Sequence, residues 1–250
     1  MRLPLSWVHA VWLVFGTVIV SAAPTSQGVR GEQDPTTELA LILQRWGDLT
    51  AEERISRLRG LESVYPNDAR VHNFLGAAYA EAGEYSQAET HFRRAVDLDA
   101  EYLDAYLNLG ALYLEQAGSD PSTLNKAQSA YAAARLLAPR DLEALYQGAF
   151  IAYLLGDPQQ TLKLLSELPS DAWSRPRAVV LEAAAACLVQ DSSRQRTVAD
   201  RLIAASGWEE EDLLPLLPRL REAGRDEFVM RVFDHLNHLG RLSVQSTEDL

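Results

Sequence analysis

The sequence has little cysteine and few helix-breaking residues, which limits the folds it can form. A single cysteine, Cys187, occurs among 250 residues, so no internal disulfide can form and stability must come from packing. Because Cys187 lies in an alanine-rich run, it is predicted to be a small buried hydrophobic residue. Only 11 prolines and 14 glycines interrupt the chain, and 47% of its residues are apolar. Alanine and leucine dominate that apolar set, which favours a folded, helical protein.

The chain also lacks an excess of positive charge. It has 23 basic and 35 acidic side chains, a formal charge of −12, and no basic cluster. Removal of an N-terminal segment containing Arg2 leaves 22 basic against 35 acidic groups, or −13. A polyanion would be repelled, so nucleic acid is excluded as a predicted partner.

A long uncharged run occurs at the N-terminus. Val8 to Val20 follows Arg2, and Val20-Ser21-Ala22 places Val20 and Ala22 at the −3 and −1 positions of a cut before Ala23, where small residues are required. These features predict a cleaved signal peptide at residues 1–22 and an exported, periplasmic or secreted protein. The alternative is an uncleaved membrane anchor at residues 3–23, which would be the only source of membrane contact. The thirteen-residue run spans only ~20 Å as a helix, short of a bilayer core of ~30 Å.

Catalytic motifs are missing from the sequence. It has no Gly-x-Ser-x-Gly, no glycine-rich loop before Lys-Ser or Lys-Thr, and no cysteine pair. His235 and His238 lie three residues apart beside Asp234, but no third ligand is identifiable, so we interpret them as polar residues of an exposed helix. A zinc hydrolase is the alternative for this pair. The prediction is a protein without enzymatic activity, cofactor or metal.

A period of 34 residues organises the remaining chain. Leu75-Gly76 and Tyr79 recur as Leu109-Gly110 and Tyr113. This pattern resembles the tetratricopeptide repeat, a pair of helices with small and aromatic residues at fixed positions. The small residues let two helices approach closely, and the aromatic rings fill the space beside them. The repeat-defining residues are Leu75, Gly76, Tyr79, Ala88, Phe92, Ala95, Leu109, Gly110, Tyr113, Ala127, Tyr131, Ala134 and Pro139.

The resemblance covers residues 35–243 and predicts an all-α, right-handed α-solenoid of about six helix pairs. The predicted units are 35–68, 69–102, 103–141, 142–175, 176–209 and 210–243, with five inserted residues around 119–123 in the third. Two interpretations of residues 176–209 remain open, a genuine repeat and a distorted spacer. Residues 23–34 are predicted to be a flexible linker, and 244–250 a short tail.

The resemblance implies that the first helix of each unit lines a concave groove. The groove residues inferred in this way are Arg70, Asn73, Leu107, Ala111, Leu114, Tyr146, Phe150 and Tyr153. Asn73 and Asn108 lie at positions where relatives hold a C-terminal carboxylate, but no lysine accompanies them, so that clamp is absent. The apolar part predicts a partner protein or peptide with an apolar face. Alternatively, Tyr146, Phe150 and Tyr153 belong to the core.

These features predict an exported scaffold that binds proteins through its groove, in cell-envelope assembly or secretion. The alternative function is a membrane-tethered regulatory subunit of an envelope enzyme complex. The step from fold to envelope role is an analogy.

Overall fold

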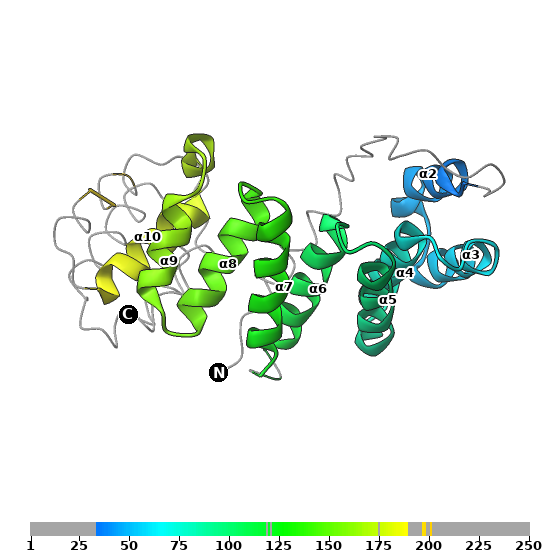
Figure 1. Cartoon of the computed structure of the whole chain (residues 1–250), viewed down its shortest axis with the longest axis horizontal. Helices are drawn as coiled ribbons and strands as arrows, with labels where there is room; N and C mark the ends of the chain where they lie inside the picture. The colour runs from blue at the N-terminus through cyan, green and yellow to red at the C-terminus, as the bar shows by residue number, and fades with distance from the viewer. Residues whose placement is uncertain are drawn as a thin grey trace, which may run out of the picture. The chain divides into compact units, whose positions relative to one another are not determined.

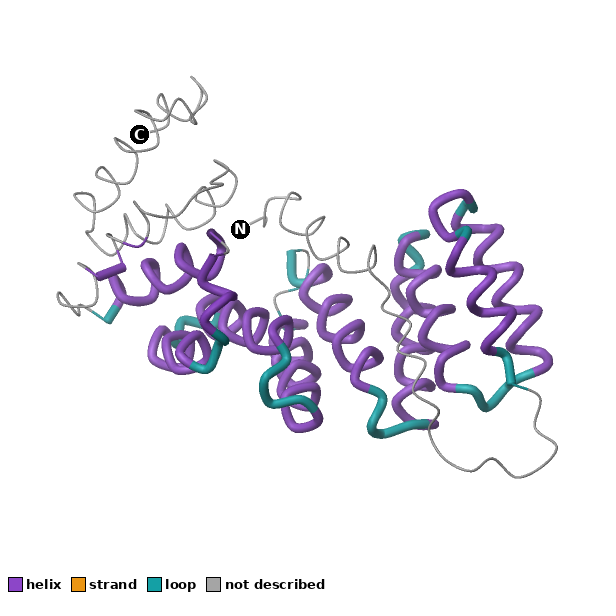
Figure 2. The backbone as a smooth tube through the Cα atoms, turned by 90° about the horizontal axis from the view of Figure 1, so that it is seen from above, coloured by secondary structure: helices purple, strands orange, loops and turns teal. Residues whose placement is uncertain are grey.

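The structure, a computed structural model, describes residues 34–118, 120, 122–174, 176–189, 197, 198 and 201. Helices are connected by short turns, and the described residues contain no strand (Figure 2). They fall into two compact units, one within Trp7–Leu137 and the other within Ala138–Leu250. None of the described helices has the length and apolar character needed to cross a membrane.

The described residues of the Trp7–Leu137 unit form three successive helix pairs (Figure 1). The first pair is α2 (Thr36–Gln44) and α3 (Ala51–Val64), joined by a short 3₁₀ turn, η2 (Trp46–Asp48). The second is α4 (Ala69–Glu81) and α5 (Tyr85–Leu98), and the third is α6 (Leu103–Gln116) and α7 (Thr123–Leu137). Each helix packs against its successor along the chain as far as α7, so each pair completes the core of its neighbour.

Local sequence signals set the helix ends. Thr50 forms a capping box with Glu53, which satisfies backbone donors at the start of α3. The Asp68 carboxylate accepts hydrogen bonds from the first backbone amides of α4. Between α4 and α5 the chain turns at Gly83, whose φ of 76° lies in the left-handed region that glycine enters without a steric penalty.

Close contact between a glycine and an aromatic ring holds each strong pair together. A Cβ placed on Gly76 would lie 2.5 Å from the Phe92 ring, and one on Gly110 would lie 2.6 Å from the Tyr131 ring. Both rings are buried. The other repeat-defining residues are also buried, except Pro139, which is exposed in the turn after α7. The small and aromatic residues therefore have the packing roles that the repeat predicts.

The second unit contains α8 (Leu142–Leu154), α9 (Pro158–Ser166), a 3₁₀ turn, η3 (Ser170–Ser174), and α10 (Pro176–Leu188). Asp157 caps α9, and Gly156, at φ 82°, forms the turn before it. α8 packs on α9, and α9 packs on α10.

The predicted all-α solenoid of helix pairs is confirmed as a fold class. The observed pairs lie inside the predicted units 35–68, 69–102, 103–141 and 142–175, and the five-residue insertion falls between α6 and α7. The predictions for residues 1–33, for most of unit 176–209 and for all of 210–243 fall outside the described residues. His235, His238 and the Cys187 side chain are among these.

Candidate functional site

The first helices of the pairs in the Trp7–Leu137 unit carry the candidate site. α4 contacts α6 directly, so residues on both helices share one surface. We call this surface the first-helix face and define it by Arg70, Asn73, Ala77, Glu81, Leu107, Ala111 and Glu115. Four groups of polar contacts cross this face between successive pairs.

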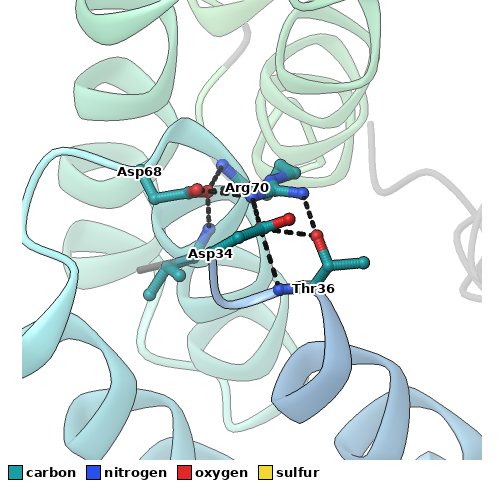
Figure 3. A network of polar contacts seen from close by, with 5 residues as sticks. Asp34, Thr36, Asp68 and Arg70 are labelled. Atoms are coloured by element: carbon teal, nitrogen blue, oxygen red, sulfur yellow. Dashed lines mark hydrogen bonds and ion pairs between the residues drawn. The ribbon is translucent and has the colours of Figure 1, made fainter. Parts of the chain in front are cut away.

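The Arg70 group ties α4 to the start of α2 (Figure 3). The Arg70 guanidinium forms ion pairs with Asp34 at 2.8 Å and Asp68 at 2.7 Å, and donates to the Thr36 hydroxyl at 2.8 Å. The Thr36 hydroxyl bond, followed by Arg70, lowers the pKa of the Asp34 carboxyl to about 2. The ionised Asp34 carboxylate therefore stabilises the folded protein at pH values above the ordinary carboxyl pKa. This stabilisation is lost as the pH falls towards 2 and the carboxylate is protonated.

A second group lies at the C-terminal end of α4. The Trp46 indole donates to Glu81 at 2.9 Å, and Glu81 also forms an ion pair with Arg54 of α3. The Arg54 guanidinium lies 4.9 Å from the centre of the Trp46 ring, and burial lowers its pKa. Arg54 therefore depends on Glu81 and on the ring for its stabilisation.

Replacing Glu81 by glutamine is expected to lower the free energy of unfolding by about 1–2 kcal/mol, because a largely enclosed Arg54 loses its counter-charge. The glutamine carbonyl can still accept from Trp46, so the change isolates the charge. Urea unfolding of Glu81→Gln beside Glu101→Gln, a change at an exposed residue, provides the comparison. Equal stability of the two variants would show that the ion pair contributes nothing.

The third group lies in the middle of the face and connects α4 to α6. The Asn108 amide donates to the Asn73 carbonyl oxygen at 2.8 Å, and the Asn73 amide donates to the Tyr102 hydroxyl at 3.4 Å. Asn73 is buried, and burial raises the pKa of Tyr102, which stays neutral. These contacts engage the amide of Asn73 within the protein.

Further along α6, the Tyr85 hydroxyl of α5 donates to Glu115 at 2.9 Å. Burial, followed by the bond to Glu115, raises the pKa of Tyr85 to about 12, so this hydroxyl keeps its proton at neutral pH. α4 and α6 together carry one basic residue, Arg70, against three acidic residues, Glu81, Asp104 and Glu115. The face is therefore unsuited to an acidic partner.

The predicted groove residues separate into accessible and buried ones. Leu107 and Ala111 are partly accessible on the first-helix face, whereas Leu114 is buried. In the second unit Tyr146 is partly accessible, but Phe150 and Tyr153 are buried. The buried side chains of Leu114, Phe150 and Tyr153 contribute to the core, which for Phe150 and Tyr153 was the alternative interpretation. Fewer of the predicted apolar groove residues are therefore accessible to a partner.

A cluster of possible metal ligands was not predicted from the sequence. Glu62 of α3, His72 of α4 and His91 of α5 come together between these helices. The three residues belong to two repeat units and lie 10 and 19 residues apart. No short motif marks them, because only the packing of α3, α4 and α5 brings them together.

Comparison with known proteins identifies the repeat. Residues 76–116 match the family described as TPR repeat. This segment of the chain is a tetratricopeptide repeat. This matched segment includes the Gly76–Phe92 contact and the whole of α6, so the sequence signature and the packing coincide.

Several solved structures share the fold. The chain resembles PilF of Pseudomonas aeruginosa at 16% identity, with a TM-score of 0.62 over 85% of this chain and 95% of that one. A thermophilic tetratricopeptide-repeat protein of Thermus thermophilus aligns at 15% identity and a TM-score of 0.52, covering 75% and 99% of the two chains. YrrB, described as having an unusual peptide-binding site, aligns at 12% identity and a TM-score of 0.56, over 74% of this chain and 98% of YrrB.

One curated relative matches over a short segment. A Caenorhabditis elegans protein named as a protein O-mannosyl-transferase is 38% identical over 55 residues, which is 22% of this chain and 8% of that protein. The chain thus spans less than a tenth of the length of this relative. So short a match carries no transferase activity over to the present chain.

Proposed function

We propose that this tetratricopeptide-repeat protein is a scaffold that binds a protein segment through its first-helix face. The observation that carries this proposal is the pattern of internal contacts on the face. Arg70, Asn73 and Glu81 of α4 are held by other residues of the same unit, whereas Leu107 and Ala111 of the neighbouring α6 remain partly accessible. A rigid polar frame around an accessible apolar strip suits an amphipathic segment.

The chemistry of the face defines the partner more closely. Arg70 is paired with two carboxylates, and α4 and α6 add three acidic residues to the surface. A partner segment with apolar side chains and neutral or basic flanks fits this arrangement, and a C-terminal carboxylate does not. The description of YrrB as having a peptide-binding site supports a peptide ligand in a protein of this fold.

The setting that we propose is the cell envelope. The segment Val8 to Val20 with its small-residue cut supports export of the chain, and the role in envelope assembly or secretion is an analogy from the fold class and this location. Fractionation of cells producing the tagged full chain tests export, since a chain that stays in the cytoplasm at its full length would contradict it.

Replacing both Leu107 and Ala111 by glutamine is expected to weaken partner capture at least about tenfold, because the apolar strip becomes polar. The matched control is Leu136→Gln, which makes the same change on α7, a second helix, where the leucine is 84% exposed. Crosslinking pull-down from native envelope, with quantitative mass spectrometry, compares both variants with the parent chain.

Circular dichroism establishes that all three proteins are folded before capture is compared. A partner retained by Leu136→Gln and lost by the double variant supports the first-helix face. Equal capture by the double variant and the parent chain would place the interface elsewhere.

The second candidate function is a membrane-tethered regulatory subunit, which requires residues 3–23 to remain attached. It is favoured by the uncharged run at the N-terminus. Retention in the membrane fraction after a high-salt wash, together with an intact N-terminus by mass spectrometry, would promote this candidate above an exported soluble scaffold.

A further inference from the structure

Three side chains that can bind a metal lie close together between α3, α4 and α5. None of them takes part in the contacts described for the first-helix face. The Nδ1 atoms of His72 and His91 lie 3.2 Å apart, and the Glu62 carboxylate oxygen lies 3.7 and 3.9 Å from them. The side chains are 6%, 12% and 31% exposed in the order His72, His91 and Glu62. Each residue comes from a different helix, α4, α5 or α3.

These separations match the ligand spacing of a tetrahedral metal site. Ligands at ~2.1 Å from an ion in tetrahedral geometry lie ~3.4 Å from one another. The separation of the two nitrogens is within about 0.2 Å of this value, and the carboxylate oxygen must approach by only about 0.5 Å. A partly exposed glutamate side chain makes such a movement by a small change in its torsion angles.

The hydrogen bonds of His72 prepare its Nδ1 for ligation. Its Nε2 lies 2.9 Å from the Pro66 carbonyl oxygen, and because a carbonyl only accepts, Nε2 carries the proton. In the tautomer fixed in this way, Nδ1 carries the lone pair and accepts the hydrogen bond from Nδ1 of His91. A backbone carbonyl that fixes the tautomer of a histidine is the usual outer partner of a metal ligand.

The surroundings of His91 keep its ring neutral and fixed. Burial, opposed by Glu62 and assisted by His72 and Arg59, lowers the pKa of His91. The ring is stacked between Tyr79, at 5.3 Å, and His72, at 5.5 Å between centroids. A neutral imidazole held in place loses little freedom when it binds an ion.

We propose that Glu62, His72 and His91 form a binding site for a divalent transition metal, with zinc as the best-fitting ion. Two imidazole nitrogens and one carboxylate are a ligand set that zinc accepts, and a water molecule completes the tetrahedron. His91 then moves its proton from Nδ1 to Nε2, and no proton is lost from the neutral ring. The ion joins α3 of the first pair to α4 and α5 of the second, so it stabilises the interface between repeats.

Arg59 is the charged group that opposes this site. Its guanidinium donates to the Tyr79 hydroxyl at 2.6 Å and is exposed to solvent. Solvent screens the repulsion between this cation and the bound ion, while Glu62 neutralises part of the ion's charge. A hydrogen-bonded histidine pair without metal is the competing interpretation, and zinc titration distinguishes the two.

The test uses the full chain in which the other strong zinc ligands are removed, with His9, His235, His238 and Cys187 each replaced by alanine. Isothermal titration with zinc chloride after treatment with a chelator is expected to show one ion per chain. The Tm is expected to rise by about 5–10 °C at a zinc concentration near one hundred times Kd.

Two further substitutions in the same background locate the ion. His91→Phe keeps a stacked ring and removes a ligand, while Glu62→Gln keeps both imidazoles and removes the carboxylate charge. Each is expected to weaken zinc binding at least about tenfold, with circular dichroism in chelator unchanged. If His91→Phe is unfolded, Glu62→Gln alone decides. Absence of zinc binding by the background chain, or unchanged affinity in folded Glu62→Gln, would overturn the proposal.

Discussion

Replacing Phe92 by alanine is expected to lower the free energy of unfolding by about 3–5 kcal/mol. The Phe92 side chain is 1% exposed, and its ring covers the backbone of α4 at Gly76. Removing the ring leaves a cavity between α4 and α5 that neither helix can close, because the neighbouring pairs hold both in place. Urea unfolding followed by circular dichroism measures the loss.

Leu136→Ala is the control for this substitution. Leu136 is 84% exposed on α7, so its removal is expected to change stability by less than about 0.5 kcal/mol. Similar losses in the two variants would contradict the assignment of Phe92 to the core.

Replacing Gly76 by alanine is expected to destabilise the protein by about 1–3 kcal/mol, although alanine is the better helix former. The new Cβ would lie 2.5 Å from the Phe92 ring, so either the ring or α5 has to move. Gly60→Ala is the matched control, because Gly60 lies in α3 with nothing within 4 Å of its Cβ position. That change is expected to stabilise by about 0.5–1 kcal/mol.

A double-mutant cycle shows that the ring is the cause. In the Phe92→Ala background the Gly76→Ala change has no ring to displace, so its cost is expected to vanish or become a small gain. An equal cost in both backgrounds would mean that the glycine is required for another reason.

The packing of the repeats could be predicted from the sequence because it depends on residue size at fixed spacing. Gly76 and Phe92 are 16 residues apart, and Gly110 and Tyr131 are 21 apart, which is 16 plus the five inserted residues. The structure places each glycine against its ring. A one-residue shift in register would separate these partners, so the sequence defines the pairing sharply.

The contacts of the candidate site could not be predicted in the same way. Arg70 was predicted to face a partner from its repeat position, but its charge is taken up by Asp68 and by Asp34, which lies before the first helix. Such pairing depends on side-chain rotamers and on a segment outside the repeat. Leu114 has the same repeat-based prediction as Leu107, yet it is buried, because the depth of a position depends on how far the next pair covers it.

The Glu62, His72 and His91 cluster escaped prediction for a different reason. A metal site whose ligands lie on one helix shows a short spacing in the sequence, whereas this cluster needs three helices to bring its members together. Knowledge of the helix pairing turns three unrelated residues into one site.

The central claim, that the first-helix face binds a protein segment, is tested most directly by photocrosslinking in cells that naturally produce the protein. A photoreactive amino acid is placed at Leu107 in one full-length variant and at Leu136 in another. The account predicts a discrete crosslinked partner from position 107 and none from 136. The same partner crosslinked from both positions, or from 136 alone, would contradict binding at the first-helix face.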